Sequence, residues 1–341
     1  MKIGIVEKPG VLKLTDRDVP KIKNPLDVLI KVKRVGICGS DIHIFHGKNP
    51  FAVYPRVWGH EFVGEVVETG SDVSAVKKGA HVVVEPIIYC GKCYACRQGR
   101  GNICEELKVM GVHIDGGCQE YIVVPANNVH VLPDALSWDE AVLIEPFTIG
   151  AQAAYRGNVQ KDDFVMVMGA GTIGLTVARM CKLAGAKVIV SDMVDEKLAY
   201  AKTCGADFII NAKNENVLDT VLKITDGMGA NVVVDAVCNK KSFEDTIDLC
   251  SVAGRIVELS FNEIASEIVP VNIIKKEITI CGSRLQTKRF PVVIDYLKQG
   301  KLDLAGFITK IYNVNNMEEA FDFVDKNNAS VRKVAITFDG E

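Results

Sequence analysis

The sequence predicts an α/β protein of two domains, one rich in short β-strands and one built on a doubly wound parallel sheet. The chain has 341 residues, and at roughly 150 residues per domain this length suits two domains. Strand signals separated by turns fill the first 85 residues, whereas from about residue 164 buried strands alternate with helices. The second rhythm is typical of a parallel sheet covered by helices on both faces.

The composition excludes several other classes of protein. Hydrophobic residues make up 48% and charged residues 24% of the chain, which excludes disordered and fibrous proteins. The net charge is −3, so nucleic acid is not an expected partner. The longest uncharged stretch, residues 164–178, is 15 residues long with three glycines and is too short to span a membrane. Charged residues interrupt residues 1–10, so we expect no secretory signal and a cytoplasmic protein.

The elements expected in the first part of the chain are strands rich in β-branched residues and bounded by glycine, proline or charge. They cover residues 28–33, 62–67, 81–84, 121–124 and 129–132, with a loop-rich lobe at residues 86–117.

In the second part we expect an alternation of strands and helices. The strands are residues 164–168, 188–190, 208–210, 232–234 and 255–257, and the helices run to residue 183 and over residues 196–204. The tail from about residue 287 is expected to hold a helix, a loop and a last strand at residues 333–338.

The cysteines indicate a metal site. There are eleven, an odd number that argues against a disulfide framework. Four thiolates in one short window can chelate a soft cation, and four protein ligands leave no open position, so we expect a structural zinc rather than an iron–sulfur cluster. We expect most of the remaining cysteines to be buried small hydrophobic residues, apart from Cys38. The four in the window are Cys90, Cys93, Cys96 and Cys104.

A second set of candidate metal ligands is spread over the first half of the chain. One thiolate, one imidazole and a carboxylate are the ligand set of a catalytic zinc that keeps one position open. From spacing alone, the same residues could equally be buried structural ones. The candidates are Cys38, His60, Glu61 and Glu145.

A glycine-rich motif follows the strand at residues 164–168 and opens a helix, which is the context of a dinucleotide-binding turn. Gly169 would permit the tight turn, Gly171 the approach of a pyrophosphate to the helix N-terminus, and Gly174 close packing of helix on strand. The motif is Gly169-Ala170-Gly171-Thr172-Ile173-Gly174.

The residue expected to select the cofactor is Asp192, which ends the next strand 21 positions after Gly171. Its carboxylate would hydrogen-bond the adenosine ribose and repel a 2′-phosphate, which favours NAD over NADP. Lys197 is close enough in sequence to complicate this selection, although it could equally be a solvated helix residue.

Several segments resemble zinc-containing medium-chain alcohol dehydrogenases. The run Gly59-His60-Glu61, with glycines at 64 and 70, resembles that family's signature, and residues 36–43 resemble its first-ligand segment. The cysteine window resembles its structural zinc lobe, and the resemblance covers essentially the whole chain. It implies a GroES-like catalytic domain at residues 1–147 and 287–341, and a Rossmann NAD-binding domain at residues 148–286. It also implies a substrate cleft at their junction and a homodimer or homotetramer.

Within this family, Glu61 and the Glu145-Pro146 segment resemble the sorbitol and threonine dehydrogenase branch. The resemblance implies Cys38 and His60 as zinc ligands, with Glu61 slightly ahead of Glu145 as the third. It further implies that Ser40 and His43 relay the alcohol proton to solvent. A turn residue at Ser40 and a surface histidine at His43 are the alternatives.

Residues 49–57, 111–117, 144–148 and 289–300 resemble a narrower group, bacterial L-gulonate and L-galactonate 5-dehydrogenases, which includes the so-called starvation-sensing dehydrogenase. A sugar-acid carboxylate should meet a cation or another polar group, and the candidates are Arg56, His113 and Arg284. The alternatives are a polyol or threonine dehydrogenase and a sensor that binds nucleotide and metabolite without turnover. The intact set of candidate ligands and relay residues speaks against the sensor.

Overall fold

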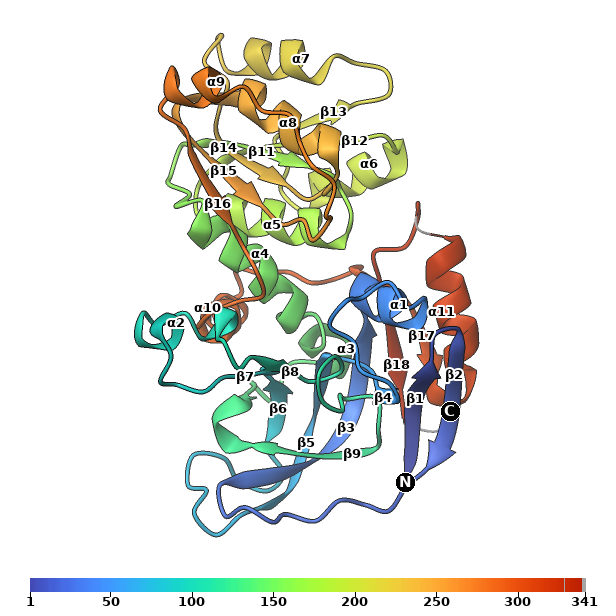
Figure 1. Cartoon of the computed structure of the whole chain (residues 1–341). Coiled ribbons are helices and arrows are strands. Elements are labelled where there is room, and N and C mark those ends of the chain that lie inside the picture. The colour runs from blue at the N-terminus through green and yellow to red at the C-terminus, as the bar shows by residue number, and fades with distance from the viewer. Residues whose placement is uncertain (328, 339–341) are drawn as a thin grey trace. The chain divides into compact units, whose positions relative to one another are not determined.

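The computed structural model describes residues 1–327 and 329–338, and the chain divides into two compact units (Figure 1). The first unit comprises Met1–Glu145 and Ile294–Glu341, and the second comprises Pro146–Val293. The boundaries expected from the sequence lie after residues 147 and 286.

The first unit is built on a sheet in the order β10-β6-β5-β3-β18-β17, with β9 also paired to β3. Its strands pair mostly antiparallel, whereas β17 and β18 run parallel to each other. The inner strand β3 is rich in β-branched residues and largely buried, as a strand with neighbours on both edges should be. The strands are β3 (Asp27–Ile37), β5 (Glu61–Thr69), β6 (His81–Val84), β9 (Tyr121–Pro125), β10 (Val129–Val131), β17 (Ile308–Asn313) and β18 (Lys333–Thr337).

Smaller elements complete this unit. A three-stranded sheet joins β1 (Lys2–Lys8), β2 (Val11–Asp16) and β4 (Arg56–Val57), and a two-stranded one joins β7 (Ile87–Ile88) and β8 (Lys108–Val109). The helices are α1 (Gly39–Phe45), α2 (Tyr94–Arg97), α3 (Trp138–Ala141) and α11 (Met317–Lys326), with 3₁₀ turns at Gly101–Ile103, Ala126–Asn128 and Val314–Asn316.

The register of β3 with its two neighbours brings distant residues together. Gly36 pairs with Glu61 of β5 on one side and with Ala335 of β18 on the other. Ile37, the last residue of β3, pairs with Val334. The start of β5, the end of β3 and the start of β18 therefore meet at one place in the sheet.

The second unit is a six-stranded parallel sheet in the order β13-β12-β11-β14-β15-β16. This is the doubly wound order: strands are added first on one side of β11 and then, from β14 onward, on its other side. The predicted fold class is therefore confirmed. The strands are β11 (Phe164–Met168), β12 (Lys187–Asp192), β13 (Phe208–Asn211), β14 (Ala230–Asp235), β15 (Cys250–Glu258) and β16 (Thr279–Gly282).

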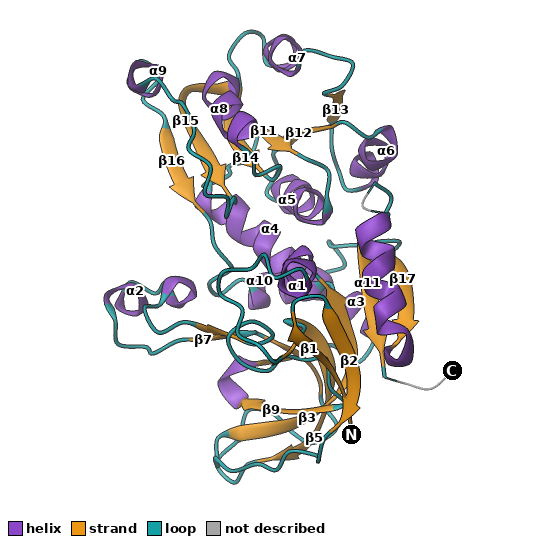
Figure 2. Cartoon of the chain, turned by 45° about the vertical axis from the view of Figure 1, so that its right-hand side comes forward, coloured by secondary structure: helices purple, strands orange, loops and turns teal. Residues whose placement is uncertain are grey.

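Helices cover this sheet because its strands are continuous apolar runs (Figure 2). Met166, Ile189 and Val233 are fully buried and pack against Val221 of α7 and Ile247 of α8. Two helices, α4 (Ile144–Arg156) and α10 (Phe290–Lys298), cross the boundaries of this unit. The helices wholly inside it are, in chain order, α5 (Thr172–Leu183), α6 (Asp195–Thr203), α7 (Val217–Ile224), α8 (Lys240–Leu249) and α9 (Pro270–Ile274).

The tail holds more structure than the predicted helix, loop and last strand, because it also contains β17 and α11. Helix α11 has a strongly charged sequence, and only Met317, Ala320 and Phe321 are buried, so its apolar stripe is narrow. Among residues 1–327 and 329–338, none of the helices combines the length and the apolar character that a membrane span requires.

Candidate active site and structural metal centre

Three of the predicted catalytic ligands lie together in the first unit. One ligand atom each of Cys38, His60 and Glu61 lies within 4.8 Å of the other two. Cys38 is the N-cap residue of α1, directly after β3, while His60 and Glu61 stand at the beginning of β5. A thiolate, an imidazole and a carboxylate at these separations fit a zinc ion with one position left open.

His60 is oriented by a carboxylate that the sequence analysis did not single out. Its Nδ1 lies 3.5 Å from Oδ1 of Asp41, which is fully buried, and Oδ2 of Asp41 accepts a 2.8 Å hydrogen bond from the backbone N–H of Cys38. Burial alone would lower the pKa of His60, but Asp41 and the Cys38 thiol raise that pKa well above its ordinary value. With Nδ1 facing Asp41, the other ring nitrogen is left for a metal.

The carboxylate of Glu61 is fixed by a glycine and a lysine. A Cβ on Gly36 would lie 2.1 Å from Oε2 of Glu61, so only glycine leaves room for this side chain. Nζ of Lys333 lies 2.7 Å from both carboxylate oxygens and also donates to the carbonyl of Ile37 at 3.3 Å. Glu61 is 1% exposed and Lys333 is 3% exposed.

Glu145 lies near the three ligand residues but does not share their tight grouping in the described part of the chain. It is buried at the beginning of α4. Burial raises the pKa of Glu145 to about 7, and the charge of Glu61 adds to the rise, while His60 and Lys333 oppose it. The geometry therefore favours Glu61 as the third direct ligand, with Glu145 as a neighbouring carboxyl group.

The two predicted relay residues lie on α1. Ser40 is half-buried and His43 is exposed, and they are three residues apart, so they lie on the same side of the helix. Ser40 is two residues from Cys38. A hydroxyl and an imidazole therefore lie on one side of the helix that Cys38 caps, the imidazole at an exposed position.

The four-cysteine window forms a compact group in the lobe at residues 86–117. The sulfur atoms of Cys90, Cys93, Cys96 and Cys104 all lie within 4.8 Å of one another, and the Cys93–Cys104 pair is 3.9 Å apart. Zinc–sulfur bonds of about 2.3 Å in a tetrahedron place sulfurs about 3.8 Å apart, so the group fits zinc.

Backbone N–H groups point at the sulfur atoms of this group. The backbone N–H groups of Cys90 and Glu106 donate to Sγ of Cys104 at 3.3 and 3.2 Å, and that of Cys93 donates to Sγ of Cys90 at 3.4 Å. Backbone N–H groups of Glu105 and Cys96 lower the pKa of Cys93 to about 6. Donors of this kind stabilise thiolates, which are the form that binds metal.

The glycine motif has the geometry of a phosphate-binding turn. Gly169 follows β11 with φ +94°, in the region that favours glycine, and a Cβ on Gly174 would lie 1.9 Å from the Gly169 carbonyl oxygen. Gly171 is the N-cap residue of α5, and a Cβ there would meet nothing within 4 Å. Thr172 and Ile173 begin the helix behind it. The open space over a helix N-terminus fits the pyrophosphate of a dinucleotide.

Asp192 ends β12 beside this turn. Its two carboxylate oxygens accept hydrogen bonds from the backbone N–H groups of Ala170, at 2.8 Å, and Val194, at 3.0 Å. These bonds fix the carboxylate next to the motif, where a ribose hydroxyl would be recognised. Lys197 lies in the first turn of α6, the helix that comes after Asp192 in the chain.

Two of the substrate candidates, Arg56 and His113, lie in the first unit, and the third, Arg284, lies in the second. Nη1 of Arg56 lies 3.0 Å from Oδ1 of Asp115, so this arginine already has a carboxylate partner. His113 accepts a 3.1 Å hydrogen bond at Nδ1 from the backbone N–H of Val109. Arg284 lies in the second unit, with its guanidinium 5.9 Å from the ring centre of the exposed Phe261.

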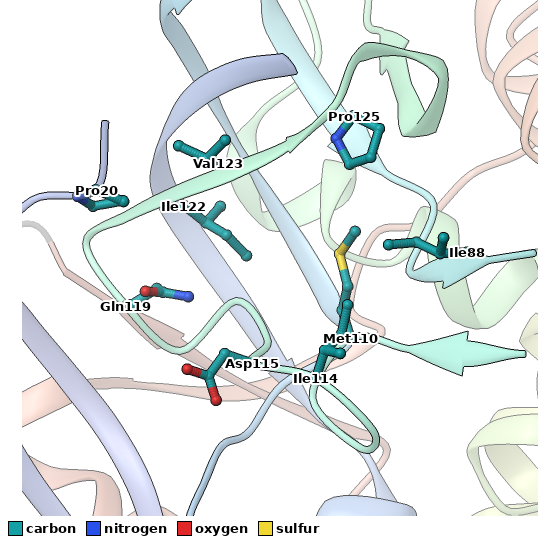
Figure 3. Close-up of a pocket in the computed structure, with 9 residues that line it drawn as sticks. All are labelled: Pro20, Ile88, Met110, Ile114, Asp115, Gln119, Ile122, Val123 and Pro125. Carbon is teal, nitrogen blue, oxygen red and sulfur yellow. The ribbon is translucent and has the colours of Figure 1, made fainter. Parts of the chain in front are cut away.

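The first unit also contains a cavity of about 290 Å³, and none of the residues that line it belongs to the candidate sites described above (Figure 3). Asp115 and Gln119 are its polar members among mostly apolar side chains, and Asp115 also pairs with Arg17 and Arg56. No candidate ligand or relay residue lines it, so it is not where a zinc site would act. It is lined by Pro20, Ile88, Met110, Ile114, Asp115, Gln119, Ile122, Val123 and Pro125.

The chain is similar to known proteins over nearly its whole length. Residues 24–134 match the family of the alcohol dehydrogenase GroES-like domain, and residues 172–299 match the zinc-binding dehydrogenase family. The starvation-sensing protein RspB of Escherichia coli K12 is 40% identical over 99% of both chains. The L-galactonate-5-dehydrogenase of the same organism is 35% identical, also over 99% of both chains.

The crystal structure of the rspB alcohol dehydrogenase from Escherichia coli CFT073, complexed with NADH, superposes with a TM-score of 0.94 at 39% identity over 99% of both chains. The chain belongs to the zinc-type medium-chain alcohol dehydrogenase family. It is a zinc-type dehydrogenase, so the predicted family and enzyme class are confirmed, and the zinc-binding family and the NADH-bound neighbour agree with the predicted cofactors.

Proposed function

We propose that this dehydrogenase oxidises a secondary alcohol of a sugar acid of the L-gulonate or L-galactonate type with NAD, giving the keto acid. The reaction class rests above all on the buried group of Cys38, His60 and Glu61. The choice of substrate is supported by the whole-length similarity to an L-galactonate-5-dehydrogenase.

In this proposal Cys38, His60 and Glu61 hold the catalytic zinc, Glu145 stands beside it, and the four-cysteine group holds a structural zinc. When bound, the catalytic zinc would polarise the alcohol oxygen and NAD would accept the hydride. Oγ of Ser40 takes up the proton that the alcohol loses while its own hydroxyl proton moves on toward the His43 imidazole, which passes a proton to solvent. An imidazole can both accept and donate a proton, which suits this transfer.

The cofactor is proposed to bind with its pyrophosphate over Gly171 and its adenosine ribose on Asp192. The open space over Gly171 and the two backbone hydrogen bonds that fix the Asp192 carboxylate support this placement. The negative charge of Asp192 disfavours a 2′-phosphate, so kcat/KM is expected to be higher with NAD than with NADP.

Arg284 is our first candidate for the substrate carboxylate, because a guanidinium group can bind a carboxylate with two parallel hydrogen bonds. The test compares the wild type with Arg284→Ala on L-gulonate and on sorbitol. We expect the KM for L-gulonate to rise at least about tenfold, as for the loss of a charged hydrogen bond, with any activity on sorbitol unchanged. An unchanged KM for L-gulonate would remove Arg284 from this role.

The alternative substrates are polyols and L-threonine, which suit the same metal and cofactor sites. A panel of aldonates, uronates, polyols and L-threonine, followed by NADH formation, decides between them. Highest kcat/KM on a C5-hydroxy aldonate supports the proposal, whereas highest kcat/KM on sorbitol or threonine contradicts it. No turnover on any member by protein of confirmed zinc content would favour the sensor alternative.

We further propose a homodimer or homotetramer in the cytoplasm. Edge strand β16 and helix α9 carry the exposed apolar side chains Ile280, Val271 and Ile274, a surface that favours pairing with a second copy. An odd number of cysteines, four of them grouped as candidate metal ligands, suits a reducing compartment. Sedimentation of a monomer at micromolar concentration would contradict the oligomer.

A further inference from the structure

Lys333 is an unusual lysine in the first unit. It is 3% exposed, whereas lysines are almost never fully buried unless they are paired. It begins β18, next to the end of β3, and Nζ lies 2.7 Å from both oxygens of Glu61. Both oxygens of the carboxylate in the candidate metal site are therefore contacted by one buried ammonium group.

Stability alone does not explain this pair. A buried ion pair contributes little or nothing to stability relative to well-packed apolar side chains, because both charges lose their hydration. The site could have held Glu61 by backbone donors or by a neutral hydroxyl. A permanent cation at this position instead changes the charge that Glu61 offers to a metal.

The effect of Lys333 is opposite to that of the partner of His60. Asp41 is an anionic acceptor facing His60, and such partners raise the basicity of a ligand and strengthen its bond to metal. Lys333 donates to both oxygens of Glu61, withdraws electron density from the carboxylate and repels a nearby dication. One ligand is thus strengthened and the other is weakened.

We propose that Lys333 is a positioning residue that keeps Glu61 a weak and displaceable ligand of the metal held by Cys38 and His60. The inference rests on the proposed metal site. Because Lys333 neutralises part of the Glu61 charge, more positive charge remains on the metal for the substrate oxygen. Gly36 serves the same arrangement, since a Cβ there would occupy the position of Oε2 of Glu61.

The test measures how fast each metal is released to a chelator and the visible spectrum of the cobalt(II)-substituted enzyme. Lys333→Met removes the charge at similar length, Lys333→Arg keeps it, and Lys310→Met is the matched control on the exposed face of neighbouring β17. The four-cysteine group provides a second release phase within every sample.

We expect Lys333→Met to slow release from the Cys38 site by about tenfold, the lower end of the range for partners of metal ligands. Its cobalt spectrum should shift, while Lys333→Arg and Lys310→Met keep the wild-type rate and spectrum. The four-cysteine phase should be the same in all variants. Release from the Cys38 site that is equal to or faster than wild type in Lys333→Met would overturn the inference.

If Lys333→Met does not fold, a second pair of variants can test the same inference. Glu61→Gln and the double variant Glu61→Gln/Lys333→Met remove the carboxylate charge, and the double variant leaves no unpaired buried ion. Equal release rates of these two proteins support an action of Lys333 through Glu61, and different rates overturn it. If wild type and Cys38→Ser release the same amount of metal, the proposed metal site itself fails, and the inference with it.

Discussion

Asp41→Asn tests how the catalytic zinc is held. The substitution is nearly isosteric, and an asparagine oxygen can still accept the hydrogen bond from the Cys38 backbone that Oδ2 accepts at 2.8 Å. What is lost is the negative charge 3.5 Å from Nδ1 of His60, at a residue that is 0% exposed. The change therefore isolates electrostatics from the local fold.

The magnitude follows from the separation. Two full charges 3.5 Å apart interact by about 5 kcal/mol at an effective dielectric constant of about 20, which is an upper bound. A metal-bound imidazole is neutral and carries only partial charge on its N–H, so the loss should match the known range for partners of metal ligands. That range is about 10- to 100-fold in zinc affinity, or about 1.4 to 2.7 kcal/mol.

The assay is competition for zinc with a fluorescent chelator, which yields a dissociation constant for each of the two sites. Asp115→Asn is the matched control, because it removes a paired carboxylate elsewhere in the same unit. Wild-type affinity of Asp41→Asn at the Cys38 site, with an unchanged Tm, would refute the assigned role of Asp41.

Two further predictions concern the second unit. Gly174→Ala should lower Tm, because its Cβ would lie 1.9 Å from the Gly169 carbonyl oxygen. Gly171→Ala should keep the wild-type Tm and weaken NADH binding, measured by fluorescence titration, because a Cβ there meets nothing within 4 Å. Equal behaviour of the two variants would contradict the motif geometry. Burial, with the charge of Asp235, raises the pKa of Glu258 from 4.5 to about 7. The folded state thus binds this proton more tightly, and the resulting stability is full below about pH 4.5 and is lost as pH rises through about 7. The urea midpoint of Glu258→Gln should fall less than that of wild type between these pH values, and parallel curves would count against the shift.

Much of the fold could be predicted from the sequence where a local pattern decides the structure. The runs at residues 164–168 and 232–234 are apolar throughout, as buried parallel strands must be, and they became β11 and β14. Strands β1 and β17 and helix α11 were missed, because their charged residues mask a narrow buried face. Only pairing with distant strands decides such segments.

The candidate site divides in the same way. Cys38 and His60 stand in recognisable motifs, and Glu61 adjoins His60, so the sequence could nominate them together. Asp41 was within reach, as an acidic residue in the first turn of a helix that begins after a ligand. Lys333 could not be predicted as a partner of Glu61, because the two residues are 272 positions apart in the sequence. They meet only because β18 pairs with β3 and β3 pairs with β5.

The two ligand groups point to an open zinc site at Cys38, His60 and Glu61 and a closed one at the four cysteines. Mass spectrometry can count the zinc ions per chain in wild type and in folded Cys38→Ser protein. We expect two zinc ions in wild type and one in Cys38→Ser, matching the two ligand groups. Two zinc ions in both proteins, or one in both, would contradict this assignment.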